Sequence, residues 1–446
     1  MKHRQNVTSV LPWMLACALA AGAPAAYGAD GFLSRNGETL FPIGCYELPE
    51  SDEALAAMAK AGINMVHCHS RADLDRAYAA GLMAVVPLPL QEGPTDALKA
   101  KVAELVDHPA IAIWEGPDEI VWNFTAFSGL HRTMGIHKTP GEWWRQTSEA
   151  VAYAEQQAAQ IIPNMRAAVE YIHSVDTARR PVWINEAQSS DVHYVRQCMD
   201  FVDITGCDIY PVNPKGRPLF NVGNATERWL LTGEGKPVWM VLQAFSWHEL
   251  GDYYGHKEAA YPSYADTRFM AYDVITRGAH GVLYWGSRFT KNDAFRASIL
   301  AIAHELAMLH PFLTAPGLDG VKTQMIDLPR RISSSEEEPA MTVDEVNRLV
   351  RQARAAWEPN VRVTARKAGE DLLLIVVNED EVAHMGVSVT GLETIEGKTL
   401  HLLYGDETRA VAQGEVVIRM QPLQVKVYCT DPARCVDDLT GRDFAD

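Results

Sequence analysis

The chain of 446 residues contains no motif for metal binding or thiol chemistry. Its 7 cysteines form no CxxC pair and no Cys/His spacing typical of zinc, and no Ser-His-Asp or Cys-His motif is recognisable. Beyond the N-terminal segment, no apolar run is long enough to span a bilayer. We therefore expect no metal ion, no cofactor and no insertion into a membrane.

Basic residues are scarce relative to acidic ones. The chain has 40 Lys and Arg against 57 Asp and Glu, for a formal charge of −17. Loss of Lys2 and Arg4 with a cleaved N-terminal segment would leave about −19, which is −17 minus 2. An acidic surface disfavours DNA, RNA and anionic membranes as partners, and it is compatible with a neutral substrate.

The first 28 residues are typical of a secretory signal. Lys2–Arg4 are basic, Leu11–Ala21 are mostly apolar, and small residues follow, so cleavage is expected after Ala25 or Gly28. Cys17 lies where a lipoprotein site could be, but the residues before it match such a site poorly. We expect a soluble protein that is secreted or periplasmic.

Export would permit disulfide bonds. Cleavage of the expected signal would remove Cys17, so that 6 of the 7 cysteines would remain. Cys429 and Cys435 can close a short loop near the C-terminus and are the expected pair, whereas the others fall in apolar runs and are expected to be buried.

Short apolar runs alternate with segments of helical periodicity along most of the chain. A Gly precedes several runs, as at Gly62 and Gly81, and a helix-to-strand turn requires such a residue. Alternating strands and helices predict a parallel sheet, and eight such units predict closure into a (β/α)8 barrel. The expected strands are Phe41–Glu47, Ile63–His69, Met83–Leu88, Ala110–Trp114, Pro181–Glu186, Val202–Ile209, Pro237–Gln243 and Gly281–Trp285.

The pattern changes after Pro311, which predicts a smaller second domain. Alternating strands of an all-β sandwich are expected at Asp371–Asn378, Met385–Thr390, Leu400–Tyr404, Glu415–Arg419 and Gln424–Cys429. The expected division of the chain is a signal at 1–28, the barrel at 29–330, a linker with a helix (Val343–Ala356) at 331–358, and the sandwich at 359–446.

The stretch Asp107–Trp122 delivers carboxylates to the end of an expected strand. The apolar run Ala110–Trp114 is followed by Glu115, a Gly-Pro turn, Asp118 and Glu119. The loops that follow the strands of a barrel hold its active site. Since apolar surroundings raise the pKa of a carboxyl, we expect Glu119 to be a general acid. The alternative is that Glu119 only caps the helix that follows.

A long connection with many aromatic residues, Trp122 to Thr147, comes next. Long loops in compact domains are commonly functional, and these aromatics argue against disorder. We expect this segment, with no strand or helix of its own, to cover the barrel mouth as a lid or subsite wall.

Residues at the C-terminal strand ends should share one mouth. Carboxylates, amides and aromatic rings dominate this set, which suits sugars, because rings stack on apolar sugar faces and polar groups bind hydroxyls. The expected catalytic residues are Glu119, Asp118, Glu186 and Asp208. The expected substrate-binding residues are Glu47, His69, Glu115, Tyr210, Gln243, Trp247 and Trp285.

The chain resembles the (β/α)8 glycoside hydrolases of the large retaining clan that includes β-galactosidases, cellulases and β-mannanases. The stretch Trp114–Glu119 is similar to the strand-4 motif of that clan, an Asn-Glu pair whose Glu is the acid/base. Glu119 occupies the position of this Glu, whereas Asp118 replaces the Asn. Asp208–Pro211 and Gly281–Trp285 are similar to its strands 6 and 8. The resemblance implies hydrolysis of O-glycosidic bonds in an oligo- or polysaccharide.

The chain departs from this clan at strand 7, where Gln243 takes the place of the nucleophilic Glu. A neighbouring carboxylate (Glu186, Asp208 or Glu47) could act instead, as a nucleophile or as the base of an inverting reaction. Asp118 and Glu119 could also work as a pair, as in hexosaminidase barrels, where an acetamido group of the substrate attacks. The third alternative is a barrel that binds glycans without cleaving them. We expect Gln243 to point into the mouth and donate a hydrogen bond to the sugar.

Overall fold

The computed structural model describes residues 26–27, 31–35, 37–251, 256–326, 360–382 and 384–435. The expected signal at 1–28 lies almost entirely outside these residues, and so does the linker helix expected at Val343–Ala356. The expectations about export and about the linker therefore stay predictions.

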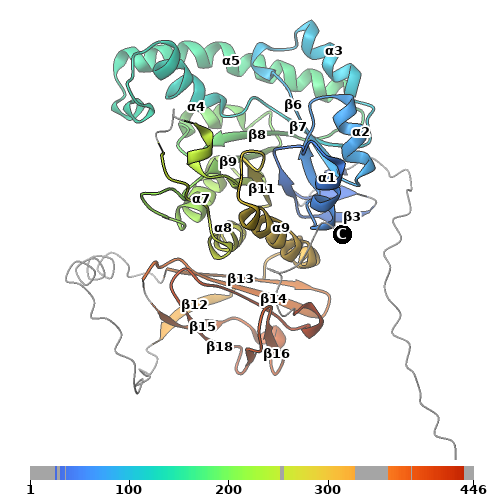
Figure 1. The fold of residues 1–446 in the computed structure, drawn as a ribbon, viewed down its shortest axis with the longest axis vertical. Helices are drawn as coiled ribbons and strands as arrows, with labels where there is room; N and C mark the ends of the chain where they lie inside the picture. The colour runs from blue at the N-terminus through green and yellow to red at the C-terminus, as the bar shows by residue number, and fades with distance from the viewer. Residues whose placement is uncertain are drawn as a thin grey trace, which may run out of the picture.

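Eight parallel strands close into a barrel in the order β10-β11-β4-β5-β6-β7-β8-β9. All eight strands predicted from the sequence are confirmed, with ends shifted by a few residues. They are β4 (Ile43–Cys45), β5 (Met65–His67), β6 (Met83–Pro87), β7 (Ile111–Glu115), β8 (Val182–Ala187), β9 (Ile204–Ile209), β10 (Val238–Gln243) and β11 (Gly281–Trp285). Figure 1 shows this barrel above a separate β domain.

Helices surround the barrel and connect its strands (Figure 1). The α-helices are α1 (Asp52–Lys60), α2 (Arg71–Ala79), α3 (Asp96–Leu105), α4 (Ile120–Thr125), α5 (Ser148–Val175), α6 (Val192–Val195), α7 (Asn221–Gly233), α8 (Tyr264–Thr276), α9 (Asp293–Met308) and α10 (His310–Leu313). Short helical turns are η1 (Leu90–Glu92), η2 (Ser128–Thr133), η3 (Pro140–Arg145), η4 (Arg196–Cys198), η5 (Trp247–Leu250), η7 (Glu393–Ile395) and η8 (Pro432–Arg434).

Local sequence explains where these helices begin and end. The side chains of Ser51, Ser70 and Thr95 accept a backbone N–H in the first turns of α1, α2 and α3. Gly62 and Gly81 follow α1 and α2 with φ of 94° and 76°, a left-handed backbone that favours glycine. These turns direct each helix back into the next strand.

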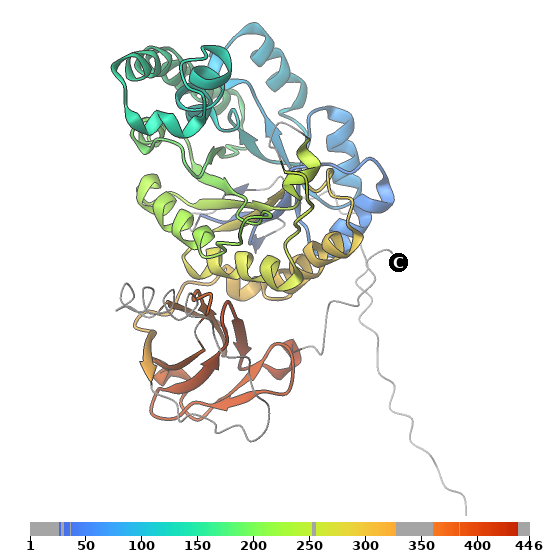
Figure 2. The ribbon, with the colours of Figure 1, turned by 60° about the vertical axis from the view of Figure 1, so that its left-hand side comes forward.

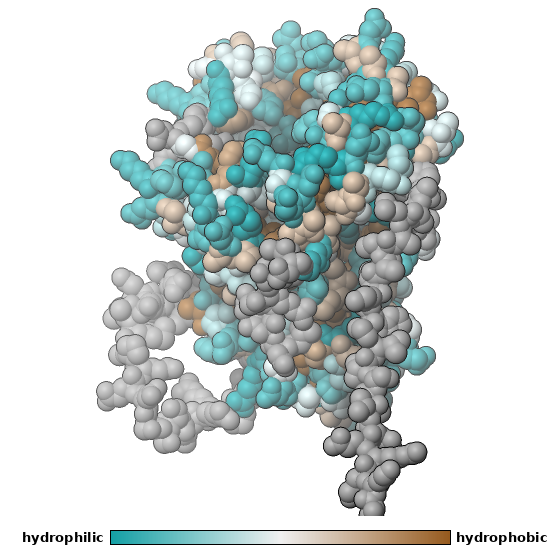
Figure 3. Space-filling model, turned by 45° about the vertical axis from the view of Figure 1, so that its right-hand side comes forward, coloured by the Kyte–Doolittle hydropathy of each residue, from teal (hydrophilic) through white to brown (hydrophobic). Residues whose placement is uncertain are grey.

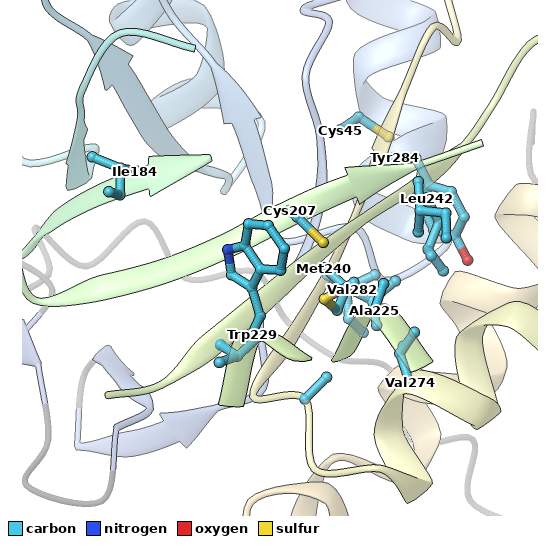
Figure 4. Close-up of a cluster of buried hydrophobic side chains, with 14 of the residues drawn as sticks. Cys45, Ile184, Cys207, Ala225, Trp229, Met240, Leu242, Val274, Val282 and Tyr284 are labelled. Carbon is cyan, nitrogen blue, oxygen red and sulfur yellow. The ribbon is translucent and has the colours of Figure 1, made fainter. Parts of the chain in front are cut away.

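Strand residues alternate between the barrel interior and the layer of helices. Trp183 of β8 and Trp239 of β10 fill the interior, with ring centroids 5.4 Å apart. On the outer side, Cys207 and Met240 pack against Trp229 of α7, as Figure 4 shows. A side chain two positions beyond Trp183 or Trp239 therefore lies in the interior again, near the C-terminal mouth.

The C-terminal domain consists of two antiparallel sheets, as the sequence predicts. One has the order β12-β15-β18 and the other β13-β14-β19-β16-β17. Their bounds are β12 (Lys322–Ile326), β13 (Val361–Ala368), β14 (Asp371–Asn378), β15 (Met385–Thr390), β16 (Thr399–Leu402), β17 (Thr408–Ala410), β18 (Val416–Met420) and β19 (Val425–Cys429). Because β12 pairs with β15, this domain receives a strand from before residue 330, the expected end of the barrel.

Strand β14 is buried on both of its faces. Leu373, Ile375 and Val377 belong to the same buried cluster as the barrel helices, whereas Leu372 and Leu374 belong to the core of the sandwich. This double burial explains why the strand is an unbroken apolar run. It also joins the two domains through apolar contact.

Polar contacts reinforce the junction between α8 and the sandwich, which lie against each other in Figure 2. Arg268 of α8 donates to the carbonyl of Val425 (2.9 Å). Arg277 donates from Nε to Glu379 Oε1 (2.8 Å), and the carboxyls of Asp273 and Glu379 are hydrogen-bonded to each other.

Cysteines and surface features complete the fold. The expected Cys429–Cys435 disulfide is not formed, since both thiols are free and Cys429 Sγ accepts the N–H of Asp431 (3.4 Å).

The surface in Figure 3 is mostly hydrophilic, with apolar residues scattered over it. In the described part of the chain, no helix has the length and apolar character needed to cross a bilayer. A small N-terminal sheet holds β1 (Ala26–Tyr27), β2 (Leu33–Arg35) and β3 (Glu38–Leu40).

Candidate active site

The floor of the barrel mouth is a buried polar cluster around Glu115. This residue ends β7 and points inward, where Tyr46 donates to its Oε1 (3.0 Å) and His67 Nε2 lies 3.4 Å from its Oε2. Burial raises the pKa of Glu115 well above its usual range and lowers the pKa of His67 to about 3. The cluster is therefore a set of neutral groups below the mouth.

The chain turns sharply after Glu115 and presents the next two acids upward. At Gly116, a Cβ atom would lie 2.9 Å from Ile184, so only glycine fits against β8. Asp118 is exposed to the mouth and accepts a hydrogen bond from Asn185 Nδ2 (2.9 Å). The Asn185 side-chain oxygen is buried and has no partner. Burial raises the pKa of Asp118, and the hydrogen bond from Asn185 moderates that rise.

Glu119 has a left-handed backbone, with φ 51° and ψ 38°. A non-glycine residue in this region is strained, and such strain is concentrated at functional sites. Glu119 occupies the N-cap position of α4, yet its side chain makes no capping bond. Its backbone N–H is held by the carbonyl of Asn185 (3.0 Å). The carboxyl is thus directed away from the helix that it precedes.

Glu186 caps α4 in place of Glu119. Its Oε1 accepts the N–H of Val121 (3.0 Å) and its Oε2 accepts the N–H of Trp122 (3.3 Å) and the hydroxyl of Ser190 (2.7 Å). The side chain is fully buried. This arrangement contradicts the expectation that Glu186 is catalytic, because both of its oxygens are committed to the protein.

The carboxyls of Glu119 and Asp208 are hydrogen-bonded to each other across the mouth. Burial and the charge of Asp118 raise the pKa of Glu119 to about 7, and burial and the charge of Glu119 raise that of Asp208 well above its usual range. Tyr210 donates to Asp208 Oδ2 (3.0 Å). Two carboxyls in contact cannot both ionise easily, so one proton is shared between them near neutral pH.

A pocket of about 520 Å³ opens above these acids. Trp285 stacks on Tyr210, with ring centroids 5.5 Å apart and planes at 25°. The lining residues are Asp118, Glu119, Trp122, Phe127, Pro140, Ala187, Gln188, Ser189, Asp208, Ile209, Tyr210, Asn213, Phe245, Trp247, Leu250, His256 and Trp285. Carboxyls on the floor and rings on the walls are the arrangement expected of a small-molecule site.

The segment from Trp122 to Thr147 forms one wall, but it is helical rather than a plain loop. It begins within α4 and continues through η2 and η3. Trp122 and Phe127 stack (6.3 Å between centroids, 13° between planes) and line the pocket with Pro140. Trp143 is buried and donates to Asp191 (3.1 Å). The expectation of no helix in this segment was wrong, because short helical turns pack its aromatics.

Gln243 contradicts the expectation of a sugar contact. Its Oε1 accepts the N–H of Val212 (2.9 Å), while its Nε2 donates to the carbonyls of Val212 (2.9 Å) and Phe245 (3.0 Å). The side chain is fully buried. Both donors are used, so Gln243 fixes the loops after β9 and β10.

Three other expected binding residues, Glu47, His69 and Glu115, also lie outside the pocket lining. Glu47 accepts the N–H groups of Gly286 (2.6 Å) and Ser287 (3.1 Å), which fixes the turn after β11. His69 is exposed beyond the end of β5, and its backbone N–H is bound by Asp73 (3.0 Å). Glu115 lies under the pocket. By contrast, the pocket does collect Asp118, Glu119, Asp208, Tyr210, Trp247 and Trp285.

Phe245 and Gln188 line the pocket and are not among the residues predicted from the sequence. Asn185 lies at the C-terminal end of an expected strand, and the alternation of β8, counted from the interior Trp183, places its side chain in the mouth. Gln188 follows β8 directly, and Phe245 follows β10 after Ala244, in the loops where a barrel places its binding residues.

Comparisons with known proteins support the fold. No protein-family model matches the chain, and a search of curated proteins finds no match. Among solved structures, a β-galactosidase from Bacillus circulans sp. alkalophilus aligns with 87% of this chain and 99% of its own, at 9% identity and a TM-score of 0.52. A family 5 glycoside hydrolase from Bacteroides vulgatus aligns with 91% of this chain and 92% of its own, at 12% identity and a TM-score of 0.50.

These neighbours are glycoside hydrolases. The chain also aligns over 60% of its length with 60% of a β-galactosidase from the psychrophilic Marinomonas ef1, at 12% identity and a TM-score of 0.41. At such identities the likeness shows a (β/α)8 barrel with a C-terminal β domain, and one fold of this kind hosts many different functions.

Proposed function

We propose that this protein is a secreted or periplasmic glycoside hydrolase that cleaves O-glycosidic bonds, with Glu119 as its general acid/base. The main support is the state of the Glu119 carboxyl. Glu119 has a strained left-handed backbone, and its carboxyl lies in the mouth. Glu186, and not Glu119, caps α4. The Glu119 carboxyl is hydrogen-bonded to Asp208 and has a pKa of about 7. A carboxyl that is protonated near neutral pH can protonate a departing glycosidic oxygen.

The choice of the second catalytic group is narrowed by the pocket lining. Asp118 and Asp208 are the other carboxyls among the described residues that line it. Asp208 is in direct contact with Glu119, whereas two carboxyls that flank a sugar are about 5–5.5 Å apart in retaining enzymes and about 6.5–9.5 Å apart in inverting ones. We assign Asp208 the role of proton partner to Glu119.

Asp118 is then the carboxyl that stabilises positive charge at the reacting carbon. It is exposed to the mouth, and Asn185 fixes its orientation. It could act by direct attack, through a water molecule, or by orienting a substituent of the substrate that attacks. The resemblance to the large retaining clan is part of this proposal. Gln243 at the strand-7 position is the feature that sets its mechanism apart from that clan.

The test is the dependence of rate on the leaving group. Glu119→Gln should slow hydrolysis of substrates with poor leaving groups by at least about 100-fold, because these need a proton from the enzyme. Aryl glycosides with very good leaving groups should be affected much less in their glycosylation step. Asp118→Asn should slow both kinds. Glu53→Gln, which changes an exposed carboxyl in α1, is the control.

If neither kind of glycoside is cleaved by the unaltered protein, while oligosaccharides still bind, the protein is a glycan-binding barrel instead. Full activity of Glu119→Gln on a substrate with a poor leaving group would exclude Glu119 as the acid.

A further inference from the structure

The acids of the pocket have no basic partner in the described part of the structure. Among the described residues that line the pocket, none is Lys or Arg, and His256 is the only imidazole. Burial raises the pKa values of Asp118, Glu119 and Asp208, and neighbouring acids raise those of Glu119 and Asp208 further. No basic side chain of the described residues lowers any of these three pKa values. Buried acids that lack a basic partner either take up a proton or pair with a cation.

A second observation concerns Asn185, which lies directly behind Asp118. Its Nδ2 is used on Asp118, while its Oδ1 is buried and has no partner. The exposed fraction of Asn185 is 1%. An acceptor without a donor next to an ionisable acid adds to the negative potential of the floor.

The walls of the pocket are also favourable to a positive charge. Trp285, Tyr210 and Phe245 form one group of rings, with Phe245 and Trp285 centroids 5.1 Å apart at 87°. Trp122 also lines the pocket. The faces of aromatic rings attract ammonium groups, most strongly where water is excluded.

We propose that the pocket binds a sugar unit that carries a protonated amino group, such as a 2-amino-2-deoxyhexose. This inference rests on the proposed function for the sugar part of the ligand. A sugar that fills the pocket excludes water from the exposed Asp118 carboxyl. An ammonium group replaces that water with three donors and a charge of the right sign. A hydroxyl in the same place supplies one donor and no charge.

Calorimetric titration of the full chain with glucosamine, glucose and N-acetylglucosamine tests this proposal. Glucosamine should bind at least about tenfold more tightly than the other two, in keeping with a hydrogen bond between charged groups. Its affinity should fall as salt is added, whereas that of glucose should not. Binding should also release protons near pH 7, seen as different heats in buffers of different ionisation enthalpy.

Asp118→Asn should remove the preference for glucosamine, and Glu53→Gln should preserve it. If Asp118→Asn does not fold, the salt dependence and proton release of the unaltered chain decide. Equal affinity for glucose and glucosamine, or tightest binding of N-acetylglucosamine, would overturn the inference.

The outcome for this inference is separable from that for the proposed function. Cleavage of neutral aryl glycosides without any preference for amino sugars would leave the hydrolase in place and remove the amino-sugar assignment. Tight, salt-dependent binding of glucosamine without cleavage of any glycoside would support the assignment and remove the hydrolase.

Discussion

At the scale of single residues, the ionisation of Glu119 should govern the pH dependence of activity. Burial and the charge of Asp118 raise its pKa to about 7, so the acid form is present below that pH and is lost as the pH rises through it. We expect kcat/KM to fall above about pH 7. This alkaline limb should disappear in Glu119→Gln. A fall of kcat/KM at alkaline pH that persists in Glu119→Gln would show that the ionisation of another group causes it.

Gln243 offers a second test at this scale. Its Nε2 donates to two backbone carbonyls, and a carboxylate cannot donate to either. Gln243→Glu should therefore lower the free energy of unfolding by roughly 1–3 kcal/mol and lower activity. Urea unfolding measures the loss of stability separately from the loss of activity. Gln188→Glu, which makes the same change at an exposed amide of the pocket lining, is the control for added charge. A large gain of activity would instead identify Gln243 as a lost nucleophile.

At the scale of secondary-structure elements, the wall formed by α4, η2 and η3 should contribute to substrate binding. Trp122 is half-buried and lines the pocket, and its side chain stacks on Phe127. Trp122→Ala should raise KM by about tenfold, because one aromatic platform is lost. Trp144→Ala is the matched control, since that ring is 52% exposed in the same segment and outside the pocket lining. Equal effects of the two variants would exclude a specific role for Trp122.

The elements themselves could be predicted from sequence more fully than the site. The runs that became β4 to β11 are apolar because they are buried on both faces, and such runs are visible without a structure. The role of Glu186 could not be predicted in this way. Its partners, the N–H groups of Val121 and Trp122, lie more than 60 residues earlier in the chain, at a separation of 65 for Val121.

A similar limit applies to Gln243 and to the wall of the pocket. Alternation along β10 directs Gln243 inward, but only the paths of two neighbouring loops decide that its amide is used on Val212 and Phe245. In the wall, the aromatics predicted a packed segment, yet no apolar period was long enough to predict η2 or η3. Side-chain direction follows from local sequence, whereas the partner depends on the tertiary fold.

At the scale of the whole molecule, the polar junction between barrel and sandwich should be sensitive to pH. The pKa of Asp273 is raised well above its usual range by burial and by Glu379, with which it shares a hydrogen bond. Its folded-state pKa exceeds its unfolded one, so its contribution to stability is present at low pH and is lost as the pH rises through the raised value. Asp273→Asn cannot ionise, and its melting temperature relative to the unaltered protein should increase with pH. Asp319→Asn, at an exposed site, is the control.

A melting-temperature difference that does not change with pH would show that Asp273 is not the group that titrates. Loss of structure at every pH would show that an Asn side chain cannot take the place of protonated Asp273 in its hydrogen bond with Glu379. Circular dichroism at several pH values distinguishes these outcomes.

The double burial of β14 has a consequence for how the protein unfolds. Leu373 and its neighbours on one face contact the barrel helices, and Leu372 and Leu374 on the other face complete the sandwich, so neither domain can lose this strand without exposing the core of the other. Independent melting of the two parts would require apolar surface to remain in water. Differential scanning calorimetry should therefore record a single heat-absorption peak for both domains, and a chain cut before residue 360 should leave the barrel prone to aggregation.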